Sequence, residues 1–121
     1  MARYCKINDH IYPAIEFLGK MRDSDWDNRE TKVIHLEMTY NLAMSLFVDG
    51  CSWSIIEEWE EEVIDETTGE TTVIPHRDEY DNSDFNIAGD VTDHRDGTMS
   101  IKMGKATDLE DAYELLYGGD L

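Results

Sequence analysis

The apolar positions near the start of the chain recur at three- and four-residue steps. They are Ile11, Ala14, Ile15, Leu18 and Met21. Because such spacing places side chains on one face of a helix, it predicts a helix over residues 9–23. Asp9 is a suitable N-cap, and Pro13 is tolerated because it falls near the first turn. The polar run 23–30 that follows predicts a loop around Trp26.

Residues 33–47 are consistent with two structures. Apolar and polar residues alternate from Ile34 to Leu46, which is typical of a long, half-buried strand. The abundance of Leu, Met, Ala and Glu, together with a second apolar set at helical spacing, favours a helix instead. Asp49-Gly50 is a hairpin turn signal that would join this run to the next apolar one. We therefore expect a strand, with the helix kept as the alternative.

The remainder of the chain predicts hairpins and one short helix. Strands are expected at 52–65, 71–74, 85–91 and 98–103. The turns between them are expected at 67–70 and at Asp96-Gly97, Pro75 is expected to end the second of these strands, and 78–84 is expected to be an acidic loop. Thr107 and Glu110 form a capping box that opens a C-terminal helix ending at Gly118. Its inward-facing residues would be Leu109, Ala112, Tyr113 and Leu116.

These elements predict one α+β domain spanning residues 1–121. Its antiparallel β-meander of about five strands is flanked by an N-terminal and a C-terminal helix, in two layers. With 40% apolar residues and 10% aromatic residues, the chain can build a core despite its charge. It shows no apolar segment typical of a signal peptide or a membrane span. Cys5 and Cys51 are far apart without CxxC spacing, so we expect two free thiols and a cytoplasmic location.

The negative charge is concentrated in the middle of the chain. The formal net charge is −18, and residues 49–96 contribute −14 of it through sixteen acidic residues and two arginines. Residues 1–48 contribute −1, and residues 97–121 contribute −3. Such a one-sided field attracts cationic partners and repels nucleic acid and anionic membranes. It also disfavours folding, because acidic residues that face one another across a sheet repel.

The sequence does not predict a metal site, a cofactor or an enzymatic activity. The four histidines and two cysteines lack the spacing of a zinc site. Asp84, Asn86 and Gly89 fit three positions of a calcium-binding EF-hand loop, but its twelfth position would be Arg95, which cannot chelate. A solvated acidic run gives no reason for two carboxyl pKa values to differ, as acid–base catalysis requires. No glycine-rich phosphate loop or Gly-x-Ser-x-Gly motif is present.

The acidic strip is the strongest functional signal. On a strand, alternate residues share a face at about 6.8 Å spacing, so Glu58, Glu60 and Glu62 would form a regular row of carboxylates. This row resembles the charge density of a nucleic-acid backbone. We therefore expect a cytoplasmic inhibitor that mimics nucleic acid and blocks the basic groove of a nucleic-acid-binding protein, such as a restriction or CRISPR effector nuclease. Trp59 or Tyr80 would be anchors. The expected partner-binding residues are Glu57, Glu58, Trp59, Glu60, Glu61, Glu62, Asp65, Glu66, Asp78, Glu79, Tyr80, Asp81 and Asp84.

One alternative stays open. The protein could be a small non-enzymatic accessory or assembly module for protein interaction, whose acidic face serves solubility. The two hypotheses differ in whether the protein competes with nucleic acid for its partner.

Overall fold

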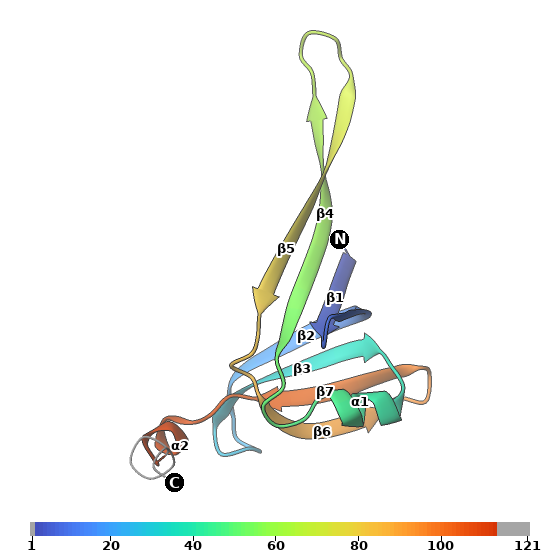
Figure 1. Ribbon diagram of the computed structural model, residues 1–121. Helices are drawn as coiled ribbons and strands as arrows, with labels where there is room; N and C mark the ends of the chain where they lie inside the picture. The colour runs from blue at the N-terminus through green and yellow to red at the C-terminus, as the bar shows by residue number, and fades with distance from the viewer. Residues whose placement is uncertain (1, 114–121) are drawn as a thin grey trace.

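A single antiparallel sheet of seven strands forms most of the structure, which is a computed structural model describing residues 2–113 (Figure 1). The strand order is β5-β4-β1-β2-β3-β7-β6, and every neighbouring pair is antiparallel. The strands are β1 (Ala2–Ile7), β2 (His10–Asp23), β3 (Arg29–Glu37), β4 (Trp53–Ile64), β5 (Thr71–Asp81), β6 (Ile87–Asp93) and β7 (Thr98–Gly104). The helices are α1 (Tyr40–Leu46) and α2 (Asp108–Tyr113). The predicted α+β meander of about five strands between two flanking helices is therefore wrong.

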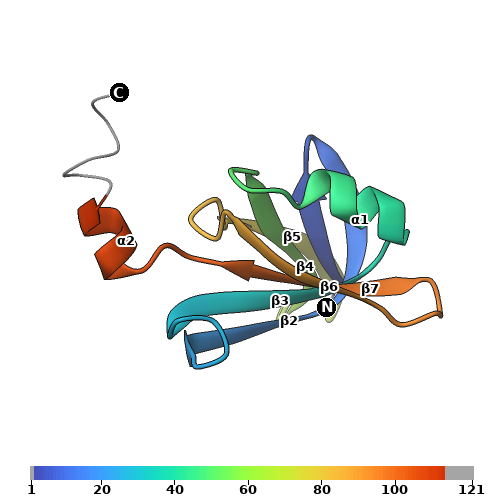
Figure 2. The same ribbon diagram turned by 90° about the horizontal axis from the view of Figure 1, so that it is seen from below.

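The core lies on one face of the sheet, which we call the inner face. Cross-strand pairing brings Cys5 opposite Ile55, Ile34 opposite Ile101 and Leu36 opposite Met99. All of these side chains are buried in one cluster. Directly paired residues point to the same side of a sheet, so this cluster lies on the inner face. The helix α1 lies beside β6 and β7 and adds Ala43 to this cluster (Figure 2). The segment between β5 and β6 adds Phe85, whose carbonyl accepts a hydrogen bond from the Trp53 indole at 2.9 Å.

The predicted helix over residues 9–23 is instead the strand β2, and four of the five apolar residues that suggested the helix, Ile11, Ile15, Leu18 and Met21, are exposed. The register of β2 against β3 shifts between Ala14 and Glu16, so Ile15 is an extra residue. Inward positions are therefore Tyr12, Ala14 and Phe17, which pack against the core. Pro13 lies outside the β2–β3 ladder, which begins at Ala14.

The ambiguous run 33–47 contains both predicted structures in succession. The strand β3 ends at Glu37, and α1 begins at Tyr40. Thr39 is the N-cap, and its hydroxyl accepts a hydrogen bond from the Leu42 N–H at 3.3 Å. Asp49-Gly50 is a turn with Gly50 at φ 84°, but it connects α1 to β4 and is not a hairpin.

Pro75 does not end the strand that was predicted at 71–74. The strand β5 runs through Pro75 to Asp81, so most of the predicted acidic loop 78–84 is strand. β5 is an edge strand, where a residue without an N–H is tolerated if its nitrogen faces solvent. The predicted turn at 67–70, the loop around Trp26 and the hairpin through Asp96-Gly97 are confirmed.

The predicted capping box at the start of α2 is confirmed in both directions. The Thr107 N–H donates to a Glu110 carboxylate oxygen at 2.9 Å, and the Glu110 N–H donates to the Thr107 hydroxyl at 3.2 Å. However, Leu109 does not face inward, because it is 81% exposed. The other side chains of the predicted inward face, and Gly118, lie outside what the structure describes. None of the described helices is both long and apolar enough to cross a membrane.

A candidate protein-binding arm

The hairpin of β4 and β5 projects beyond the rest of the sheet as a two-stranded ribbon (Figure 1). The pairing of β4 with β1 reaches Glu58, which lies opposite Ala2. In the described chain, residues 59–64 and 71–76 then pair only with each other. We call residues 59–76 the arm. Every residue from 60 to 75 is exposed, so the arm has no core of its own.

The charge of the arm has a single sign. Residues 59–76 include six acidic residues and no Lys or Arg. They are Glu60, Glu61, Glu62, Asp65, Glu66 and Glu70. The high exposure keeps these carboxylates hydrated, and no Lys or Arg within the arm offsets their charge.

The register of the arm separates its acids from one another. Glu60 lies opposite Pro75, Glu61 opposite Ile74 and Glu62 opposite Val73. In the β4–β5 ladder only one acidic pair, Glu57 and Asp78, stands directly opposite. The expected cross-strand repulsion is therefore small, because β5 places apolar or uncharged residues beside the glutamates of β4.

The two faces of the arm differ. Glu58, Glu60 and Glu62 share one face, as predicted, because their cross-strand partners are Arg77, Pro75 and Val73. Trp59 and Glu61 share the other face with His76. There the Trp59 and His76 rings stack, and a His76 ring nitrogen lies 2.7 Å from the Glu61 carboxylate. A shallow hollow beside this stack is lined by Ala2, Glu58, Trp59, Glu60, Pro75, His76 and Arg77.

Several predicted site residues lie at the root of the arm, where cations of the sheet partly neutralise them. Arg3 lies 3.9 Å from Glu57, Lys6 lies 3.5 Å from Glu79, and Arg77 lies 4.0 Å from Glu58. All these side chains are substantially exposed, so each pair contributes little to stability. They nevertheless lower the net negative charge at the root of the arm.

The remaining predicted residues have local structural roles or lie elsewhere. The Asp65 carboxylate accepts hydrogen bonds from the N–H groups of Thr67 and Thr68, which fixes the turn at the tip. The Asp81 carboxylate accepts from Ser83, and these hydrogen bonds lower the pKa of Asp81. The negative charge of Asp78 raises the pKa of Tyr80, which stays a neutral phenol. Asp84 is exposed in the β5–β6 loop and is not part of the arm.

The sequence interpretation missed part of the arm. Glu70 belongs to the tip, because its carbonyl accepts a hydrogen bond from the Asp65 N–H at 2.9 Å. Four exposed apolar residues also lie on the arm, namely Val63, Ile64, Val73 and Ile74. Pairing the residues on either side of the predicted Thr67–Gly69 turn, outward from the turn, would have placed Glu70 and these four apolar residues on the arm.

The described residues do not offer an evident site for a metal ion. No group of three or more His, Cys, Asp or Glu side chains in this part of the chain is arranged to hold one. No protein-family model matches the chain, and comparisons with curated proteins and with solved structures found no significant match.

Proposed function

We propose that this protein is an inhibitor that mimics nucleic acid, and that its arm enters the basic groove of a nucleic-acid-binding protein. The observation that carries the proposal is the one-sided charge of an exposed ribbon: six acids and no Lys or Arg in residues 59–76. Such a ribbon has no evident role in the core, because residues 60–75 are all exposed.

The spacing of the carboxylates supports the proposal. Glu60, Glu61 and Glu62 are consecutive on an extended strand, which advances about 3.4 Å per residue. A strand of B-form DNA carries one phosphate per about 3.4 Å of helix axis. Over these three residues the linear charge density is therefore close to that of one nucleic-acid strand, although alternate carboxylates point to opposite faces.

The partner expected from this chemistry has a groove lined by Lys and Arg, as in restriction nucleases or CRISPR effector nucleases. The inhibitor would act in the cytoplasm, where such enzymes work, and would not bind nucleic acid itself. It needs no catalytic residue or cofactor, since occupation of the groove is sufficient. Trp59, at the root of the arm, is the aromatic side chain that would anchor the partner.

A second candidate is the assembly module, and the apolar residues of the arm favour it. Val63, Ile64, Val73 and Ile74 are between 39% and 65% exposed. In that case the arm would bind an apolar surface of a partner, and the acids would keep the free ribbon soluble. Binding through apolar contacts would respond weakly to salt, whereas charge mimicry weakens steeply as salt rises.

A mobility-shift competition tests the proposal. The protein is added to complexes of labelled DNA, or of guide RNA, with each member of a panel of basic nucleases at low and moderate salt. Mimicry predicts release of the nucleic acid from the target nuclease, with less release at the higher salt. A stable complex that holds both the protein and the nucleic acid in the groove would exclude mimicry and favour the assembly module.

A further inference from the structure

A buried arginine lies at the end of the sheet away from the arm. The Arg29 side chain is only 4% exposed, and its guanidinium carbon lies 4.7 Å from the centroid of the Trp26 ring. Trp26 in turn packs on two glycines, because a Cβ added at Gly89 or Gly104 would lie 2.8 Å from the indole. The loop and two strands thus hold the Trp26 ring against the guanidinium.

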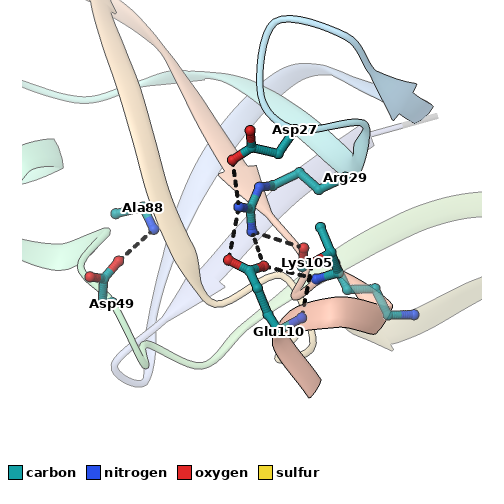
Figure 3. A network of polar contacts seen from close by, with 7 residues as sticks. Asp27, Arg29, Asp49, Ala88, Lys105 and Glu110 are labelled. Atoms are coloured by element: carbon teal, nitrogen blue, oxygen red, sulfur yellow. Dashed lines mark hydrogen bonds and ion pairs between the residues drawn. The ribbon is translucent and has the colours of Figure 1, made fainter. Parts of the chain in front are cut away.

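The guanidinium binds a carboxylate with two parallel hydrogen bonds. Nη1 and Nη2 of Arg29 donate to the two carboxylate oxygens of Glu110 at 2.8 and 3.1 Å (Figure 3). Nη1 also donates to the Lys105 carbonyl at 3.3 Å, and the Asp27 carboxylate lies 3.6 Å from Nη2. The Arg29 Nε is buried and has no hydrogen-bond partner among the described residues. The site is therefore built for an anion and has one donor to spare.

Glu110 belongs to α2, and the side chains of α2 that the structure describes, Asp108, Leu109 and Glu110, are all exposed. Leu109 of α2 is 81% exposed, so this apolar side chain is not buried against the sheet. The Glu110 carboxylate is 47% exposed, whereas Arg29 is buried, so the pair has a fixed half and a loosely held half.

We propose that Trp26 and Arg29 form a binding site for a peptide carboxylate, that Glu110 is its tethered occupant, and that an acidic peptide of another chain displaces Glu110. A buried guanidinium without an anion is strongly unfavourable, so the site stays occupied by one carboxylate or the other. The ligand that fits is a glutamate on a Thr-x-x-Glu turn, because that turn is how Glu110 is presented. This inference does not depend on the proposed inhibitor function.

The test uses the full chain with Glu110→Gln and a synthetic peptide of residues 106–113 as the probe. Calorimetric titration is expected to show saturable binding to this variant. The unsubstituted chain is expected to bind the peptide at least about tenfold more weakly, because its own Glu110 competes at high effective concentration. The same peptide with Gln at its glutamate in position 110, and the double variant Arg29→Lys with Glu110→Gln, are expected not to bind.

A folded Glu110→Gln chain that does not bind the peptide would overturn the proposal. Equal affinity for the variant and the unsubstituted chain would overturn it too, because Glu110 would then not be a competitor. If the variant does not fold, hydrogen exchange of the α2 amides in the unsubstituted chain gives the answer. Excess peptide is expected to accelerate exchange in α2, and unchanged exchange would refute displacement.

Discussion

The indole of Trp59 stacks on the imidazole of His76 where the arm leaves the sheet. Their ring centroids are 5.3 Å apart, and their planes are inclined by 17°. The two residues are also directly opposite in the β4–β5 ladder, immediately beyond the last pairing of β4 with β1. The stack therefore joins the two strands immediately beyond the described pairing of β4 with β1.

Trp59→Ala is expected to loosen the arm without unfolding the sheet. Loss of a stacked aromatic pair costs about 0.5–1.5 kcal/mol beyond the area it buries, and a two-stranded hairpin is only marginally stable. Hydrogen exchange should therefore accelerate for the amides of residues 60–64 and 71–74, with Ile34 and Ile101 in the core unchanged. Leu18→Ala, at an exposed position of β2, is the control and should leave arm exchange unaltered.

Replacing Glu58, Glu60 and Glu62 by Gln is expected to abolish partner binding and to preserve folding. The three side chains share one face of the ribbon, and their removal lowers like-charge repulsion. Binding is measured with a nuclease identified by the competition assay, and folding by thermal unfolding. Only Glu58 has a cation within ion-pair distance in the described structure, and that exposed pair is weak.

The matched control for that variant replaces Glu16 and Glu37 by Gln and Asp90 by Asn. It removes the same number of charges from exposed positions outside the arm. Normal binding by the control and loss of binding by the arm variant would locate the site on the arm. Normal binding by the arm variant would mean that this face is not the site.

Acidification is expected to detach α2 from the sheet. Hydrogen bonds from Arg29, and then from the Thr107 N–H, lower the pKa of Glu110. Because the pKa of Glu110 is lower in the folded state, its ionised carboxylate stabilises the attachment of α2 fully above the ordinary glutamate pKa of about 4.3. This stabilisation is lost as the pH falls through the lower, folded-state pKa. Amide chemical shifts of α2 should therefore change below about pH 4. Glu110→Gln should show the detached shifts at neutral pH, with no further step on acidification.

The two cysteines are expected to differ in reactivity. Burial raises the pKa of Cys5 to about 12, with a smaller contribution from Cys51. Burial also raises the pKa of Cys51, but this side chain is only partly buried. Iodoacetamide at pH 8 should therefore label Cys51 slowly and leave Cys5 unlabelled until denaturant is added. Labelling is measured by peptide mass spectrometry. Labelling of Cys5 in the native protein would contradict its burial.

The sequence predicted the elements whose signals are local. The Thr107–Glu110 capping box, the Asp96-Gly97 hairpin and the β4 strand need only neighbouring residues, and the structure contains all three. The β2 prediction failed because the bulge at Ile15 depends on pairing with β3, which short-range spacing does not show. Pro75 was misjudged for a similar reason, since only the sheet order places β5 at an edge.

The candidate site was predicted in part. The alternation of β4 correctly placed Glu58, Glu60 and Glu62 on one face. The sequence could not show that the described pairing of β1 with β4 extends only to Glu58, beyond which the hairpin forms the arm. Nor could it show that Arg29 meets Glu110, because these residues are 81 positions apart in the chain.

The register of the β4–β5 hairpin has a consequence for how this protein can diversify. Residues 59–76 form no ladder with any other described strand, so shortening or lengthening them disturbs no other strand pairing. Because side chains alternate with a period of two, insertion of two residues in each strand keeps every carboxylate on its original face. The length of the hairpin can therefore change in steps of about 6.8 Å, without any change in the rest of the sheet. Engineered variants with a longer or shorter arm are therefore expected to retain the same folded base.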